Sequence, residues 1–249
     1  MRNGSLFSAN PGPSPTFSGM AAPPPGYRPL DGPALLVKVL LGVFTLVTLV
    51  AVVSDLLEAT TLSRQLHDPA GLVQAQAVAS DSRQALLASL QLAAYLVTAV
   101  AFLVWFHRAY ANLPALGIEP LPFAPGWTVG AWLVPVLNLI RPKQIMDAIW
   151  RGSDPGRPRY DPFWCTGSVR ILVHLWWAVF VVSWLVDRTT AVLLGEESTT
   201  TGVLRAGSIG TLAADVLDLV LVGLCFELVR QATRRQQSRA ARLAIVPPA

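Results

Sequence analysis

The fold is decided by the long apolar stretch ALLVKVLLGVFTLVTLVAVVSDLL at residues 34–57. A helix of about 20 apolar residues crosses the roughly 30 Å hydrocarbon core of a bilayer. The stretch is therefore long enough to span a membrane, and Lys38 near its start can extend its ammonium group to the lipid headgroups. Four more apolar segments follow, at residues 85–106, 127–140, 168–186 and 209–229.

Composition indicates the same surroundings. Hydrophobic residues make up 53% of the 249 residues and charged residues 14%, whereas a soluble domain carries about 25% charged residues. The net charge of +4 does not indicate nucleic acid, because the basic residues gather at the ends of the apolar segments and near the carboxyl terminus. Basic residues at these places are typical of a protein beside lipid. We therefore expect membrane lipids as partners and no nucleic acid.

The third apolar segment, residues 127–140, differs from the others because it is short and contains Pro135. Apolar segments of about 10 to 14 residues are more often re-entrant or interfacial than spanning. The next residues, 143–151, would form a helix with one apolar and one charged side, a pattern typical of an amphipathic helix at the bilayer surface. Its apolar side carries Ile145, Met146 and Ile149.

The predicted fold class is all-α. We expect a polytopic membrane helix bundle with four full spans, a short re-entrant or fifth spanning helix, and an amphipathic interfacial helix, all within a transmembrane domain at residues 34–229. Residues 1–33 contain eight prolines and predict a disordered cytoplasmic tail without a signal peptide. Residues 230–249 predict a basic cytoplasmic tail that contacts anionic headgroups. Its arginines are Arg230, Arg234, Arg235, Arg239 and Arg242.

Two topologies fit the apolar segments, and the nineteen Lys and Arg residues distinguish them. With four spans and both tails inside, fifteen basic residues are cytoplasmic and four are external. With five spans and the amino terminus outside, the division is thirteen to six. The positive-inside rule favours the first arrangement, in which the chain lies in the inner membrane with both tails cytoplasmic.

A group of aromatic, proline, glycine and polar residues is spread over the middle of the chain. Its members are Trp105, Phe106, Arg108, Ala109, Tyr110, Asn112, Pro125, Gly126, Trp127, Gly130, Trp132, Pro135, Asn138, Leu139, Pro142, Ile149, Trp150, Arg151, Ser153, Asp154 and Pro155. This set resembles an uncharacterised bacterial family of multi-spanning membrane proteins, frequent in actinobacteria and labelled only as a domain of unknown function. The resemblance covers residues 85–230 approximately, and it implies a membrane protein without an assigned activity.

Five polar or aromatic residues around the broken segment are candidates for a functional surface. If the segment is helical, Pro135 removes the partner of a backbone carbonyl, and a nearby asparagine requires hydrogen bonds in a low-dielectric setting. One interpretation is a cytoplasmic platform that docks another membrane protein or a second copy of the chain. The other is that these residues fix a turn between two membrane elements. The candidate platform consists of Arg108, Asn138, Trp150, Arg151 and Asp154.

A second group of candidates lies within the apolar segments. Asp215 and Asp218 are three residues apart and share one face of a helix. Charged groups at membrane depth are costly and usually functional, so together with Gln91 and His174 they predict an intramembrane polar cluster. The cluster suggests a small transporter or channel for protons or cations. A hydrogen-bonded group that only fixes the register of the helices is the alternative.

Enzyme signatures are absent from the sequence. It contains no H-E-x-x-H, G-x-S-x-G or phosphate-loop motif, and the spacing of its histidines and of Cys165 and Cys225 does not indicate a metal site or a disulfide framework. We expect no catalytic residues, cofactor or metal. The leading hypothesis is a non-enzymatic docking or organising protein, and the alternative is the small transporter or channel.

The topology can be tested at Arg28. In a chain whose two native cysteines are replaced, a cysteine introduced as Arg28→Cys is expected to react with a membrane-impermeant thiol reagent only after the membrane is opened, because the amino-terminal tail faces the cytoplasm. Labelling of intact cells at this position would contradict the four-span arrangement.

Overall fold

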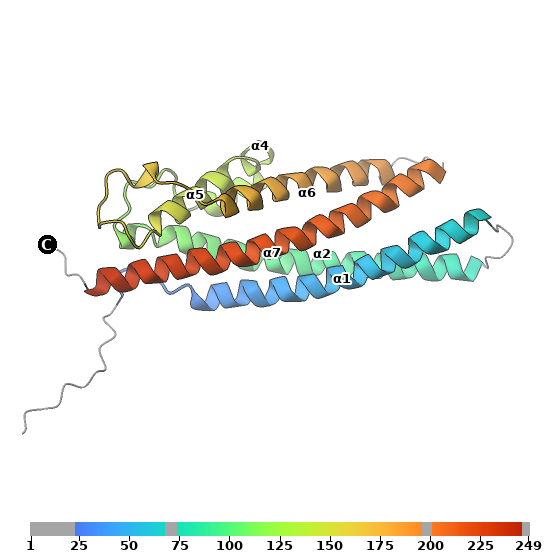
Figure 1. The fold of residues 1–249 in the computed structure, drawn as a ribbon, viewed down its shortest axis with the longest axis horizontal. Coiled ribbons are helices and arrows are strands. Elements are labelled where there is room, and N and C mark those ends of the chain that lie inside the picture. Colours follow the sequence, from blue (N-terminus) through green and yellow to red (C-terminus); the bar gives the residue numbers. More distant parts are fainter. Residues whose placement is uncertain (1–22, 68–73, 196–200, 246–249) are drawn as a thin grey trace, which may run out of the picture.

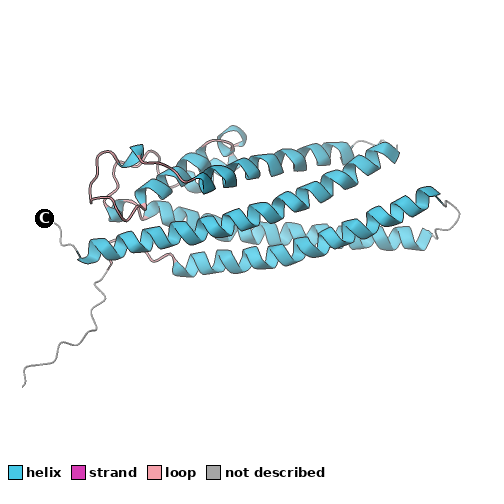
Figure 2. Ribbon diagram, viewed as in Figure 1, coloured by secondary structure: helices cyan, strands magenta, loops and turns pink. Residues whose placement is uncertain are grey.

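The computed structural model describes residues 23–67, 74–195 and 201–245. Within these residues the chain forms helices joined by loops and contains no strand (Figure 2). The predicted all-α fold is confirmed. The long helices are α1 (Asp31–His67), α2 (Gln74–Ala111), α6 (Ile171–Gly195) and α7 (Thr201–Ile245), and the short ones are η2 (Pro114–Leu116), α3 (Trp127–Leu133), α4 (Pro135–Asn138), α5 (Arg141–Gly152) and η3 (Trp164–Thr166).

The four long helices lie side by side along the long axis of the molecule (Figure 1). Helix α1 packs against α2 and α7, and α6 packs against α7. The first residues of α1 and the last residues of α7 lie at the same end of the bundle, which we call the terminal end (Figure 1). The segment between α2 and α6, residues 112–170, also lies at the terminal end, so the long helices alternate in direction.

Among the residues that the structure describes, three helical stretches are long and apolar enough to cross a membrane: Asp31–Leu57, Ser82–Ala111 and Ile171–Val192. Much of their surface consists of exposed leucine and valine side chains, among them Leu46, Val100 and Val192. A water-soluble protein rarely exposes apolar patches of this extent. Helix surfaces of this kind indicate a membrane protein whose outer face meets lipid.

The inner faces of α1 and α7 follow a common spacing of alternately three and four residues. Such spacing is typical of long helices that pack at a small crossing angle. The inner residues of α1, together with Leu30 just before it, are Leu30, Ala34, Val37, Leu41, Phe44, Thr48, Ala51 and Asp55. On α7 they are Asp215, Asp218, Val222, Cys225, Val229, Ala232, Gln236 and Arg239. The series on α1 is apolar at first and ends in Asp55. The series on α7 is apolar in its middle and has polar residues at both ends.

The third apolar segment is broken where the sequence predicted a break. Helix α3 ends at Leu133, and Val134 adopts an extended conformation before Pro135 begins α4, because the proline ring disfavours a helical residue in front of it. The segment folds back against α2, since His107 Nδ1 lies 2.8 Å from Thr128 Oγ1. Leu133 is 79% exposed, so the turn between α3 and α4 presents apolar surface outwards.

Helix α5 forms over the residues whose pattern predicted an amphipathic helix, but its apolar face does not lie on lipid. Ile145, Met146 and Ile149 are fully buried in the protein core. The charged side carries a salt bridge between Lys143 and Asp147 at 2.7 Å. The sequence pattern predicts one apolar face correctly, but it does not say whether lipid or protein covers that face.

Parts of both predicted tails, residues 1–33 and 230–249, pack against the helices of the bundle. The larger part of the amino-terminal tail, residues 1–22, and the last residues, 246–249, lie outside the described residues. The chain is held from the residues just before α1, where Leu30 is fully buried. Residues 230–245 continue α7 without a break, because their inner positions keep the spacing of the spanning part of the helix.

A close contact between α6 and α7 gives a stability prediction. A Cβ atom on Gly210 would lie 2.4 Å from Thr190 Oγ1, whereas one on Gly223 of the same helix would meet nothing within 4 Å. Gly210→Ala is therefore expected to lower the thermal unfolding temperature in detergent, although alanine favours a helix by up to about 1 kcal/mol. Gly223→Ala is the matched control and should keep or raise that temperature. Equal effects of the two substitutions would contradict the close contact.

Candidate functional site

Helix α2 carries a polar or hydrogen-bonding residue at every seventh position of its inner face. Gln84 and Gln91 bond to carboxylates of α1 and α7, and Thr98 Oγ1 lies 3.5 Å from the Leu40 carbonyl of α1. Nearer the terminal end, Trp105 Nε1 donates to Thr233 Oγ1 of α7 at 3.0 Å. We call this series the α2 polar seam, and it consists of Gln84, Gln91, Thr98, Trp105 and Asn112.

The half of the seam remote from the terminal end holds two aspartates. Gln84 Nε2 donates to Asp55 Oδ1 at 2.9 Å, and Gln91 Nε2 donates to Asp215 Oδ1 at 2.8 Å. Asp55 is itself within hydrogen-bonding reach of Asp215. Two glutamines of α2 therefore hold one oxygen of each carboxyl group, and the carboxyl groups of α1 and α7 meet beside them.

The second oxygens of these carboxyl groups have no donor. Asp55 Oδ2 and Asp215 Oδ2 are buried and accept no hydrogen bond from the described part of the chain. The side chain of Asp215 belongs to a residue that is only 6% exposed. Buried polar atoms are nearly always hydrogen-bonded, so each of these oxygens retains the capacity to accept a hydrogen bond or a proton.

Two further carboxylates lie close to this pair. Asp187 of α6 and Asp218 of α7 act electrostatically on each other, and both act on Tyr95 of α2. Within residues 23–57, 82–192 and 209–245, none of Asp55, Asp187, Asp215 and Asp218 forms an ion pair with a basic side chain. We call these four residues the carboxylate cluster. The members of the cluster act on one another as like charges.

The structure brings together some of the predicted intramembrane residues and not others. Gln91 forms a hydrogen bond with Asp215, and Asp218 lies one helical turn from Asp215. His174 is exposed on α6 and takes part in none of the described contacts with these residues. Asp55 and Asp187 were not predicted from the sequence. The seven-residue spacing of Gln84 and Gln91 was a signal that could have identified the face of α2 that meets Asp55.

The candidate platform residues lie at the terminal end, where their polar groups face other parts of the chain. Arg108 Nη1 donates to the carbonyl of Pro29 at 3.3 Å, and Arg151 Nε donates to the carbonyl of Gly167 at 2.7 Å. Asn138 is farther away on α4, and its Oδ1 is buried without a donor among the described residues.

Trp150 and Asp154 share one partner on α7. The guanidinium carbon of Arg235 lies 4.7 Å from the centre of the Trp150 ring, and Arg235 Nη2 lies 3.7 Å from Asp154 Oδ1. Arg157 Nε lies 3.9 Å from the same carboxylate. Trp150, Arg151 and Asp154 thus join α5 and its loop to other elements. Arg108 joins α2 to the segment before α1, and these contacts agree with the interpretation that the candidate residues fix a turn.

Arg239 is the centre of this end of the molecule, and the sequence pattern misplaced it. It was expected among arginines that contact lipid headgroups, but it is only 1% exposed. Its guanidinium donates to four backbone carbonyls at 2.6 to 3.3 Å, those of Leu116, Asp154, Arg157 and Pro158. Burial lowers the pKa of Arg239, while Asp154 acts in the opposite direction, and a guanidinium remains charged under such conditions.

Gln236, one turn before Arg239, extends the same network. It is fully buried, donates to the carbonyl of Ala109 at 2.9 Å and to Ser153 Oγ at 3.2 Å, and accepts from Asn112 Nδ2 at 2.9 Å. Asn112 in turn holds the backbone of Arg28, accepting its N–H at 3.0 Å and donating to its carbonyl at 2.8 Å. The segment before α1 is thereby fixed to α2 and α7.

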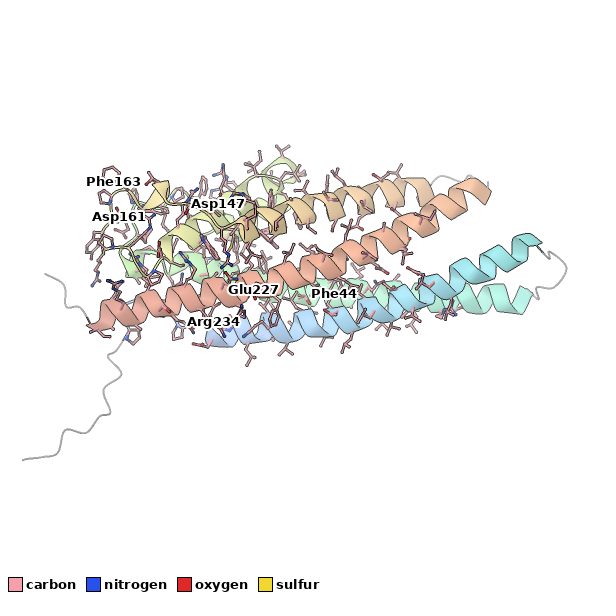
Figure 3. The ribbon with its side chains drawn as sticks, in the orientation of Figure 1. Phe44, Asp147, Asp161, Phe163, Glu227 and Arg234 are labelled. Atoms are coloured by element: carbon pink, nitrogen blue, oxygen red, sulfur yellow. The ribbon has the colours of Figure 1, made fainter. Side chains whose placement is uncertain are left out.

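The loop after α5 presents two large aromatic side chains at its surface. Tyr160 and Phe163 are 67% and 70% exposed. Figure 3 shows Phe163 and Asp161 in this loop, while Asp147 lies on α5 nearer the middle of the molecule. Asp161 forms a salt bridge with Arg157, whose Nη1 lies 2.7 Å from the carboxylate.

No group of three or more His, Cys, Asp or Glu side chains that could hold a metal ion is found among the described residues. Cys165 and Cys225 are free thiols.

Comparison with known proteins gives one match. The model of the family described as domain of unknown function (DUF4328) matches residues 68–234. No curated protein and no solved structure matches the chain.

Arg239 provides a test of the terminal end. Arg239→Met keeps an unbranched apolar stem but removes the donor from the carbonyls of Leu116, Arg157 and Pro158, and leaves that of Asp154 with only the Arg157 N–H. The free energy of unfolding should therefore fall by about 3 kcal/mol or more. Arg234→Met is the matched control, because Arg234 is exposed on the same helix and its loss should change stability by less than about 0.5 kcal/mol. Thermal and denaturant unfolding in detergent measure both. Similar losses in the two variants would contradict the role of Arg239.

Proposed function

Since the chain belongs to the family of the domain of unknown function (DUF4328), we propose its function from the geometry. The protein is a small membrane transporter or channel that binds protons or other small cations at the carboxylate cluster and passes them across the membrane. It is non-enzymatic, and it works without a resident cofactor.

The proposal includes four membrane spans, three from the long apolar helices and the fourth from residues 209–229 of α7. Helices α3 and α4 are a re-entrant element. Trp132 contacts Phe102 of α2 with ring centres 6.2 Å apart, and Phe102 is nine residues from the end of α2, which corresponds to about 13 Å along the helix. This depth supports the interpretation of α3 and α4 as a re-entrant element.

By the same scale, the carboxylate cluster would lie in the membrane half remote from the terminal end. Gln91, which holds Asp215, is fourteen residues from Trp105 and therefore about 21 Å farther along α2. If the terminal end with its basic residues is cytoplasmic, as the positive-inside rule favours, the carboxylates lie in the outer half of the inner membrane. Cations would then meet the cluster from the external side.

One observation carries the proposal: Asp215 is buried among helices that face lipid, and one of its oxygens has no donor. A carboxylate in such a place is costly unless a proton, a cation or a basic group neutralises it. Its electrostatic neighbours in the described chain are other carboxylates. A proton or small cation supplied from solution is therefore the ligand that this site suits best.

The docking role expected from the sequence stays a prediction. Four of the five expected platform residues use their side chains within the protein, so they do not support it. Tyr160 and Phe163 are large aromatic side chains exposed at that end, and they are where a docking partner would be sought.

The proposed function predicts flux across a membrane that contains the purified protein. Asp218→Asn and Asp215→Asn should each lower proton or cation flux into liposomes by about tenfold, because the amide cannot carry or neutralise the moving charge. Asp147→Asn is the matched control, since that aspartate lies on α5 in a salt bridge with Lys143. The parent and the control should conduct equally. Absence of flux of any tested cation in the parent would overturn the proposal.

A further inference from the structure

Asp55 and Asp215 form a matched pair across the contact between α1 and α7. In each residue Oδ1 accepts a hydrogen bond from a glutamine of α2, at 2.9 and 2.8 Å, and Oδ2 is buried without a donor. The two carboxyl groups lie within hydrogen-bonding reach of one another. The two unsatisfied atoms are therefore equivalent oxygens of neighbouring carboxyl groups.

Two ionised carboxylates cannot remain in contact at this place. Like charges in a low-dielectric setting repel strongly, and a carboxylate offers no donor to its neighbour. A single proton removes both difficulties, because the protonated group donates an O–H to the oxygen of the other group. The pair then carries one negative charge in place of two, and both Oδ2 atoms have a hydrogen-bond partner.

We propose that Asp55 and Asp215 together bind one proton, shared between their Oδ2 atoms, and that this pair is the ion-binding site of the membrane domain. Gln84 and Gln91 act as positioning residues. Each amide donates to Oδ1 and so leaves only Oδ2 free to take part in the shared O–H···O bond. The inference rests on the proposed function and deepens it by naming the proton as the cation.

The groups around the pair favour proton uptake. Asp218 on α7 and Asp187 on α6 add negative charge, and Ser54 of α1 and Tyr95 of α2 contribute only neutral hydroxyl groups. A proton can leave the shared bond only as the pair gains a second negative charge close to these carboxylates. The next carboxylate along α7, Asp218, is one turn from Asp215, and it is the natural group to exchange a proton with the pair.

Infrared spectroscopy of the full-length protein in lipid nanodiscs tests the shared proton. A protonated carboxylic acid has a C=O stretching band that carboxylates lack and that shifts in heavy water. The parent protein is expected to show one such band at neutral pH. Asp55→Asn and Asp215→Asn should each abolish it, because the remaining carboxyl group then accepts from the new amide and no longer shares a proton.

The double variant should look like either single variant, and Asp147→Asn should keep the band. Absence of the band in the parent at neutral pH overturns the inference, and this result does not depend on whether any variant folds. A band that survives in one single variant shows an independently protonated residue and also overturns the shared site. Folding of the variants is checked by size-exclusion chromatography.

Flux in liposomes separates this inference from the proposed function. A sodium or potassium flux together with no carboxylic acid band would overturn the shared proton and leave the transporter standing. The band with the expected loss in both single variants, but without any flux in the parent, would support the proton site and overturn the transporter.

Discussion

The absence of water from the hydrocarbon core is the constraint on which the structure depends. A polar side chain placed there must find its partner on another helix. The α2 polar seam meets this requirement with a polar residue at every seventh position, and its partners lie on α1, on α7 and in the segment before α1. These hydrogen bonds set the register of α1 and α7 against α2 along much of their length, while apolar packing fills the space between them.

The two ends of the seam satisfy their polar groups in different ways. At the terminal end, Arg239 and Gln236 bring enough N–H donors to meet the backbone carbonyls around them. At the other end the glutamines supply one donor to each aspartate, and each aspartate keeps one oxygen without a donor. The carbonyls around Arg239 and Gln236 thus find their donors within the chain, whereas Asp55 and Asp215 each keep one oxygen able to accept a proton or a hydrogen bond.

Much of the fold follows from the sequence, because length and apolarity decide which helices meet lipid. The three apolar stretches that are long enough to span agree with the first, second and fourth predicted segments, and the break before Pro135 follows from proline geometry. The helices extend beyond the apolar runs, as α1 does to His67, because polar residues continue a helix in water as well. Hydropathy marks only the part of a helix that lies in lipid.

The candidate sites were harder to predict, since burial of a single polar residue depends on which helices become neighbours. Arg239 resembles the other arginines of its segment in sequence, yet it alone among the five is almost completely buried. His174 resembles a helix-interior histidine, yet it lies on the exposed face of α6. Asp215 could be identified because a charged side chain deep within an apolar segment is costly, and its depth can be counted from the sequence. Its partner Asp55 could not be identified in this way, because their contact depends on how α1 packs against α7.

Helix α7 is fixed on both sides of the carboxylate cluster. Gly210 approaches Thr190 of α6 closely on one side, and the bonds of Thr233, Gln236 and Arg239 anchor the helix on the other. Contacts of this kind resist sliding, because a shift of α7 would break several buried hydrogen bonds at once. A change of protonation at Asp215 would therefore alter the charge of the cluster more readily than the position of the helix. The geometry thus suits a site that exchanges small ions within a rigid bundle.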